Sequence, residues 1–180
     1  MLRITVPATE FWDEIHEEFI YKKAQTLQLE HSLVSISKWE SRWNKAFLGK
    51  QEKTDEEILD YIRCMTLTQN VDPEIYTRLS DENYAEINAY IEAPMTASHI
   101  FEEKQGKKSN EIITSELIYY WMISCNIPVE FQKWHLNRLL MLIRVCSVKN
   151  SPPKKRGRRE LMKRNAALNA ARRKRLNSRG

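Results

Sequence analysis

The side chains that support catalysis or metal binding in proteins are few in this sequence and widely separated. The chain has four histidines: His16, His31, His99 and His135. None stands at the H-x-x-x-H or H-E-x-x-H spacing that places two imidazoles on one metal ion. Glu14, His16, Glu17 and Glu18 are close in sequence, but neighbours on a strand or helix point in different directions. We therefore predict no metal site and no catalytic residue.

The glycines give no sign of a phosphate or dinucleotide cofactor. There are four of them: Gly49, Gly106, Gly157 and Gly180. A phosphate-binding loop needs several glycines within a few residues, so that backbone N–H groups can approach the phosphate oxygens. No such loop exists in this sequence, and no nucleophile motif is present. We predict no cofactor and a protein that is not an enzyme.

The cysteines and the chain ends indicate the compartment. Cys64, Cys125 and Cys146 are odd in number and far apart in apolar helical surroundings, which favours reduced thiols over a disulfide framework. The first residues lack the charged and then apolar pattern of a signal peptide. No stretch approaches the roughly 18 apolar residues of a membrane span. We expect a protein that is not secreted, is not in a membrane and works in a cytoplasm.

Charge divides the chain into two parts. Residues 149–180 contain 13 Lys and Arg and the single acid Glu160, a net charge of +12, which leaves −7 for residues 1–148. Pro152 and Pro153 begin the change in composition and form a stiff spacer. We predict a globular body over 1–148, followed by a basic tail over 149–180 that is flexible or conditionally helical.

The basic tail has three open interpretations. It is a solvated arm that acts only through its charge, a contact for a protein partner, or a non-specific contact for nucleic acid. The residues that would contact nucleic acid are Lys154, Lys155, Arg156, Arg158, Arg159, Arg172, Arg173, Lys174 and Arg175. The tail contains no aromatic residue on which a base could stack. Nucleic-acid binding is therefore the alternative function, and it would be weak and non-specific.

The N-terminal region predicts a small antiparallel sheet. Leu2, Ile4 and Val6 alternate with polar residues and stop at Pro7, and 26–30 alternates in the same way. We expect 19–21 to pair with 26–30 through a turn at 23–25. Residues 11–20 also fit a helical face, so their structure stays open.

From Ser32 onward the pattern is helical. Ser32, Thr54 with Glu57, Asp72-Pro73 and Ser80-Asp81 are helix-start signals. Trp39 and Trp43, four residues apart, are more typical of a core than of a recognition patch. His135 is more typical of a helix-surface or hydrogen-bonded histidine than of a metal ligand. The predicted fold is α+β and mainly α: a small antiparallel sheet, an amphipathic-helix body, a helical hairpin and the basic tail.

The most apolar segment follows a polar loop predicted at 102–110. Residues 112–125 and 129–148 predict a helical hairpin with its turn at 126–128. The second helix is apolar on two sides, so it is either central in the core or covered by a partner. One stripe contains Leu136, Leu139, Leu140, Ile143 and Cys146. The opposite stripe contains the residues we expect to bind a protein partner: Trp134, Met141, Val145 and Val148.

Five segments resemble the tail assembly chaperones of long-tailed bacteriophages. They are LEHSL at 29–33, SKWESRW at 37–43, DYIRCM at 60–65, WHLNRLL at 134–140 and LNAARR at 168–173. The resemblance implies a non-enzymatic protein that binds the long helical tape-measure protein and supports tail-tube assembly. The implied partners are the tape-measure protein and the tail-tube subunit, with homo-oligomers as a further expectation. The implied location is the cytoplasm of the bacterial host.

Overall fold

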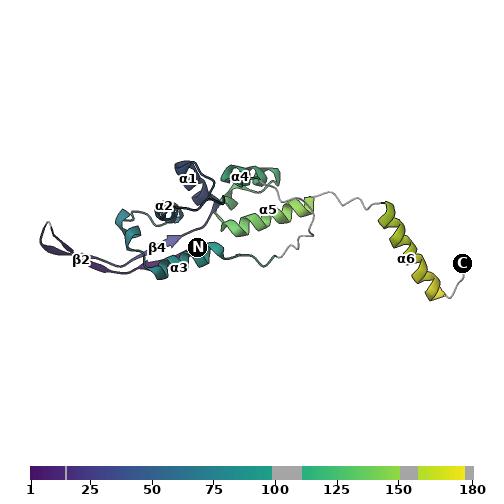
Figure 1. Ribbon diagram of the computed structural model, residues 1–180, viewed down its shortest axis with the longest axis horizontal. Helices are drawn as coiled ribbons and strands as arrows, with labels where there is room; N and C mark the ends of the chain where they lie inside the picture. Colours follow the sequence, from purple (N-terminus) through teal and green to yellow (C-terminus); the bar gives the residue numbers. More distant parts are fainter. Residues whose placement is uncertain (15, 99–110, 151–157, 177–180) are drawn as a thin grey trace. The chain divides into compact units, whose positions relative to one another are not determined.

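The computed structural model describes the whole chain except residues 15, 99–110, 151–157 and 177–180. It contains two compact units, Met1–Lys149 and Asn150–Gly180, which we treat separately. The polar loop predicted at 102–110 lies outside the described residues. The elements, drawn in Figure 1, are β1 Leu2–Val6, β2 Thr9–Asp13, β3 Glu18–Lys22, β4 Gln25–Leu29, α1 Leu33–Trp43, α2 Asp55–Met65, η1 Pro73–Arg78, α3 Asp81–Glu92, α4 Ser115–Ser124, η2 Val129–Lys133, α5 Leu136–Asn150 and α6 Arg158–Leu176. The predicted mainly helical α+β class is confirmed.

The four strands form two antiparallel pairs that share one continuous register, and we call the two pairs together the ribbon. Leu2 faces Leu29 in the pair of β1 and β4, and Thr9 faces Lys22 in the pair of β2 and β3. The expected pairing of 19–21 with 26–30 is wrong, because β3 pairs with β2 and β4 pairs with β1, so the chain reverses between β2 and β3 and not at 23–25. Glu17 takes the left-handed conformation there, with φ 51°.

The β1–β4 pair belongs to the hydrophobic core. Ile4, Val6, Leu27 and Leu29 are at most 1% exposed, and α3 packs against β1. The chain after α2 extends the pair on the β4 side, because the N–H of Leu67 donates to the Gln28 carbonyl at 2.8 Å. This half of the ribbon is therefore fixed to the helices.

The helix starts follow the local signals in the sequence. Ser32, Thr54, Asp72 and Ser80 each accept a hydrogen bond from a backbone N–H of the helix they precede. At Thr54 the Glu57 side chain completes a capping box, as predicted. These caps satisfy N–H groups that a helix cannot satisfy internally, so they place α1, α2, η1 and α3 in the chain.

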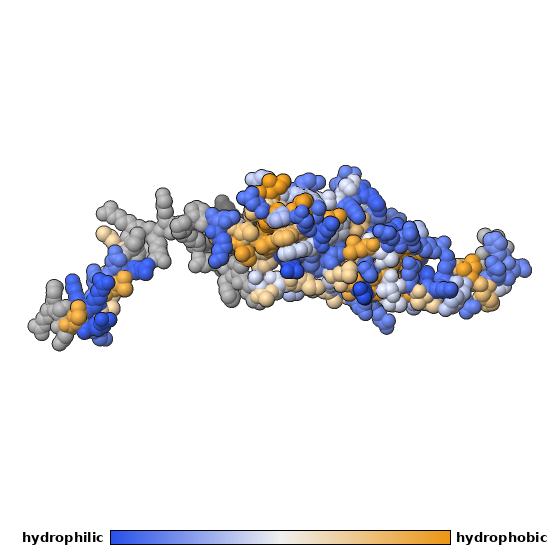
Figure 2. Space-filling view, turned by 180° about the vertical axis from the view of Figure 1, so that it is seen from behind, coloured by the Kyte–Doolittle hydropathy of each residue, from blue (hydrophilic) through white to orange (hydrophobic). Residues whose placement is uncertain are grey.

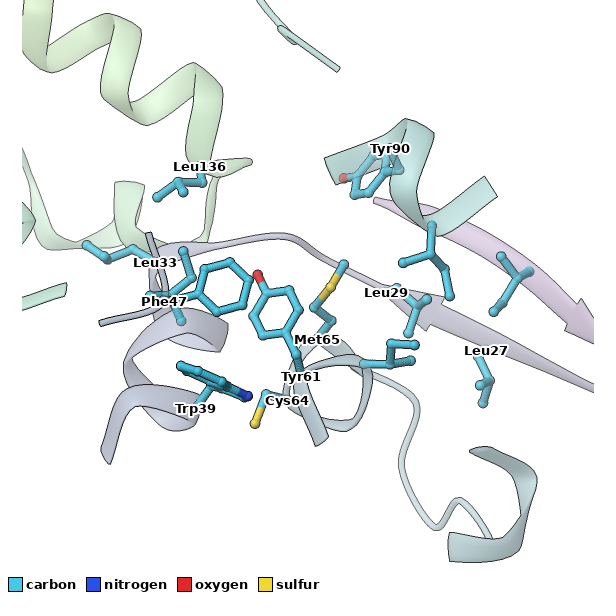
Figure 3. Close-up of a cluster of buried hydrophobic side chains, with 14 of the residues drawn as sticks. Leu27, Leu29, Leu33, Trp39, Phe47, Tyr61, Cys64, Met65, Tyr90 and Leu136 are labelled. Carbon is cyan, nitrogen blue, oxygen red and sulfur yellow. The ribbon is translucent and has the colours of Figure 1, made fainter. Parts of the chain in front are cut away.

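Aromatic side chains fill the space between α1 and α2. Trp39 is buried on α1, as its spacing predicted, and Trp43 is half-buried. Phe47 and Tyr61 have ring centroids 4.0 Å apart, and Phe47 meets Trp39 edge to face at 5.2 Å. Figure 3 shows these three rings together beside Leu33. Leu136 brings the start of α5 to the same core.

The predicted second helix of the hairpin is interrupted. Residues 129–133 form the 3₁₀ helix η2, and α5 begins only at Leu136, so a continuous helix over 129–148 is wrong. At the break His135 bridges to Ser32, and the Leu136 N–H donates to the His31 carbonyl at 2.8 Å. The helix is therefore interrupted where the chain bonds to residues 31 and 32, which are distant in sequence.

The second unit contains α6, and every side chain described on it is exposed. Its sequence favours a helix but offers few large apolar groups, as expected for a helix without a core of its own. Across the described residues, no helix combines the length and the apolar character that crossing a bilayer requires.

Candidate functional site

Three buried carboxylates hold the body together. Glu40 accepts hydrogen bonds from the N–H of Phe47 at 2.8 Å and of Ser115 at 2.7 Å, so it joins α1 to the start of α4. Asp60 accepts from Trp43 Nε1 at 2.9 Å and pairs with Arg42. These partners occupy the oxygens that a general acid or base would need for a substrate.

The third carboxylate, Glu57, caps α2 and pairs with Lys45. The Lys45 ammonium and the Thr54 N–H lower its pKa. The carboxylate is therefore held in its charged form by partners of the fold. In the described residues, every buried side-chain nitrogen and oxygen has a hydrogen-bond partner.

Two histidines form a buried pair at the junction of β4, α3 and α5. The rings of His31 and His135 are 5.1 Å apart. His135 Nε2–H donates to the Tyr90 carbonyl at 2.9 Å, while Nδ1 accepts from the Asn137 N–H at 3.3 Å. This arrangement fixes His135 as a neutral tautomer and agrees with the predicted hydrogen-bonded role. The alternative of a helix-surface position is wrong, because the residue is only 6% exposed.

His31 is also held neutral. A hydrogen bond of 2.5 Å joins its Nδ1 to the Tyr61 hydroxyl. Burial, and then the nearby His135 ring, lowers the pKa of His31 to about 4. Burial likewise lowers the pKa of His135. Both rings are enclosed by core residues, so this pair supports the fold.

Neither metal ligands nor paired thiols are brought together in the described part of the chain. No group of three or more His, Cys, Asp or Glu side chains lies close enough there to hold a metal ion. Cys64 is buried, Cys125 and Cys146 are half-buried, and all three are free thiols. Burial raises the pKa of Cys64, which makes its thiolate scarce.

Three of the four residues predicted to bind a partner line a hollow on α5, and Val148 does not. Trp134, Met141 and Val145 line it together with Met95 and Leu142, and its volume is about 390 Å³. The three predicted residues are half-buried, and Val148 is 54% exposed. Trp134 lies before α5 begins, yet it still faces the same hollow as Met141.

Trp134 is held firmly at the edge of this hollow. Its ring stacks with Phe131 at 4.1 Å, and the Arg138 guanidinium lies 4.1 Å from the ring centroid. The opposite stripe faces inward, since Leu136, Leu139 and Ile143 are buried. One side of α5 is thus core and the other is a partly open apolar surface.

A larger apolar groove between α2 and α3 was missed in the sequence. It measures about 730 Å³ and is lined mainly by Leu48, Ile58, Leu59, Tyr84, Ile87 and Ile91. Ile58, on α2, is 39% exposed in this groove. Figure 2 shows hydrophobic side chains gathered among hydrophilic ones on one face of the body. The excess of apolar residues on both helices was the available signal.

The basic tail residues predicted to contact nucleic acid fall into three groups. Arg172, Arg173, Lys174 and Arg175 are exposed at the end of α6. Arg158 and Arg159 begin this helix. Lys154, Lys155 and Arg156 lie outside the described residues.

Comparison with known proteins leaves this geometry to be interpreted by itself. No family model, no curated protein and no solved structure matches the chain.

Proposed function

We propose that this protein is a non-enzymatic chaperone of phage tail assembly that binds an apolar helical stretch of the tape-measure protein. The observation that carries the proposal is the hollow on α5, where Trp134, Met141 and Val145 are half-buried instead of filling the core. An amphipathic helix presents apolar residues at i, i+3, i+4 and i+7, and such residues dock in apolar grooves.

The polar chemistry of the body supports a binding role over a catalytic one. Glu40, Glu57 and Asp60 are engaged in helix caps and ion pairs, and His31 and His135 are engaged with each other and with tyrosines. The proposed activity takes place in the cytoplasm of the bacterial host, before the tail tube encloses the tape-measure protein.

Binding to a purified tape-measure fragment tests the proposal. We expect the double variant Trp134→Ser with Met141→Gln to lose binding at least tenfold in isothermal titration calorimetry, while its melting temperature changes little. The matched control is Tyr120→Ser with Ile123→Gln, which removes two exposed apolar side chains of α4 outside the hollow. The control variant should bind like the wild type.

Two results would contradict the proposal. Unchanged binding by the Trp134 and Met141 variant would show that the hollow on α5 is not the client site. Loss of binding in Ile58→Gln alone would place the client in the groove between α2 and α3.

The second candidate function is non-specific binding of nucleic acid through the basic tail over 149–180. The observation in its favour is the exposed cluster of Arg172, Arg173, Lys174 and Arg175. Neutralising about six to ten phosphates would give a log–log salt slope near −5 to −9 for duplex DNA. We expect only weak retention that disappears by about 0.2 M salt. A sequence-specific footprint would show specific nucleic-acid binding instead and would count against the chaperone function.

A further inference from the structure

The half of the ribbon formed by residues 9–22, which we call the arm, exposes large aromatic side chains on both faces. The exposed fractions are 44% for Phe11, 49% for Trp12, 67% for Phe19 and 62% for Tyr21. Cross-strand partners share a face, so Trp12, Phe19 and Tyr21 lie on one side and Phe11 on the other. Aromatic side chains of this size are usually covered by a core or an interface.

The arm is a shaped surface with a fixed base. Trp12 and Phe19 meet edge to face with their ring centroids 4.9 Å apart. At the base, Lys22 forms ion pairs with Asp72 at 3.3 Å and Glu74 at 2.9 Å. Within the described residues, β2 and β3 pair only with each other, so their outer edges have no strand partner. The arm therefore presents aromatic rings and strand edges in a defined geometry.

The negative charge of the arm indicates which kind of partner surface would bind it. Five of its residues are acidic: Glu10, Asp13, Glu14, Glu17 and Glu18. Its one lysine is the Lys22 that Asp72 and Glu74 already engage. Carboxylates beside exposed rings favour an arginine-rich partner segment, because a guanidinium group can form an ion pair with a carboxylate and can also stack over an aromatic ring.

The same chain supplies such a segment in α6. This helix has eight Lys and Arg residues and a single acid, Glu160. Arg164, Leu168, Arg172 and Arg175 follow i, i+4, i+8 and i+11 spacing, which places them along one side. All four are exposed. With 19 residues, α6 is about 28 Å long, which exceeds the roughly 17 Å of a five-residue strand.

We propose that the arm of one copy of this protein binds α6 of a second copy. Each copy offers one arm and one α6, so the contact joins two different surfaces and is head-to-tail. The association weakens as salt screens the charges. This assembly is independent of the client site on α5.

Complementation between two full-length variants tests this contact. The arm variant carries Trp12→Ala and Phe19→Ala. The α6 variant carries Arg172→Gln, Arg173→Gln, Lys174→Gln and Arg175→Gln. In sedimentation velocity at about 50 mM salt, where the screening length is roughly 14 Å, the wild type should exceed the 21.4 kDa of one chain as its concentration rises. Each variant alone should stay at that mass, and their equimolar mixture should reach twice that mass.

The controls distinguish this contact from non-specific association. Glu82→Gln with Glu86→Gln removes two exposed acids of α3, and this variant should associate like the wild type. Circular dichroism should show all variants folded. A mixture that stays at the mass of one chain, or an arm variant that still associates alone, would overturn the proposal. Association of the α6 variant with itself would also overturn it, because the arms would then be pairing with each other.

Discussion

The two halves of the β-ribbon share one register but have opposite surroundings. In β1 and β4 the inward positions carry aliphatic side chains, and Val6, Leu27 and Leu29 are fully buried. In β2 and β3 aromatic residues lie on both faces and carboxylates stand beside them. A strand with one apolar face buries that face against helices. A strand pair with aromatic rings on both faces cannot bury both faces against a single core. The pairing of the strands therefore does not determine whether a segment belongs to the core or to a binding surface.

A single arginine links the two halves. Arg78, the last residue of η1, donates to Thr9 Oγ1 at 2.7 Å and to the Pro7 carbonyl at 2.6 Å. It also reaches the carbonyls of Lys22 and Lys23 at 3.5 and 3.4 Å. These groups lie where Pro7 and Lys23 interrupt the strand pairing, so Arg78 supplies the hydrogen bonds that the ladder lacks.

The largest expected effect is in the buried half. Leu27→Ala removes a fully buried side chain from β4 and leaves a cavity between the ribbon and the helices. We expect the free energy of unfolding to fall by about 2–5 kcal/mol. Urea unfolding followed by circular dichroism measures it, with Phe19→Ala in the arm as the matched control. Equal losses in the two variants would contradict the division of the ribbon.

A lower pH should also reduce the free energy of unfolding, through the buried side chain of His31, which follows β4. The pKa of His31 is about 4 in the folded protein and 6.5 when unperturbed, so only the unfolded chain takes up a proton between these values. The stabilisation is complete above pH 6.5 and declines as the pH falls toward 4, by about 3 kcal/mol in all.

Denaturant unfolding at a series of pH values between 6.5 and 5 measures this decline. The control His31→Gln should be less stable at pH 7 but should show a shallower slope. An unchanged slope in that variant would mean that His31 is not the group responsible.

A smaller effect is expected where the halves meet. Arg78→Gln removes a charged donor from four acceptors that are largely exposed, so we expect a loss of about 1 kcal/mol. The same variant should speed amide hydrogen exchange in residues 9–22 more than in β1 and β4. Equal acceleration in both halves would show that Arg78 stabilises the ribbon as a whole.

Local signals in the sequence predicted the helices better than the sheet. Ser32, Thr54 and Ser80 bind N–H groups within three residues, so their effect can be seen in a short window. The reversal between β2 and β3 has no glycine or Asn-Gly pair, and Glu17 takes the unusual φ instead, so the usual hairpin signal is missing. The pairing of 19–21 was misplaced for that reason.

Long-range contacts limited the prediction of the site. Apolar periodicity runs through 129–148, but the bridge between Ser32 and His135 interrupts the helix there. The sequence selected Trp134, Met141 and Val145, which do line one hollow. The groove between α2 and α3 depends on how two helices 16 residues apart lie together, and no short window contains that information.

The smallest expected effect is within the arm, and it tests whether the exposed rings support the fold at all. Trp12 and Phe19 pack edge to face at 4.9 Å, an arrangement worth about 0.5–1.5 kcal/mol when both strands are ordered. If the arm lies outside the cooperative unit, this energy should be absent from global unfolding, so Trp12→Ala, Phe19→Ala and the double variant should each shift it by under about 0.5 kcal/mol. Hydrogen exchange of arm amides should respond instead, with a similar acceleration in both single variants and little more in the double variant, because either change already breaks the pair. Additive losses in global stability would instead make the arm part of the folded core, and its exposed rings would then serve the body as Leu27 and Leu29 do.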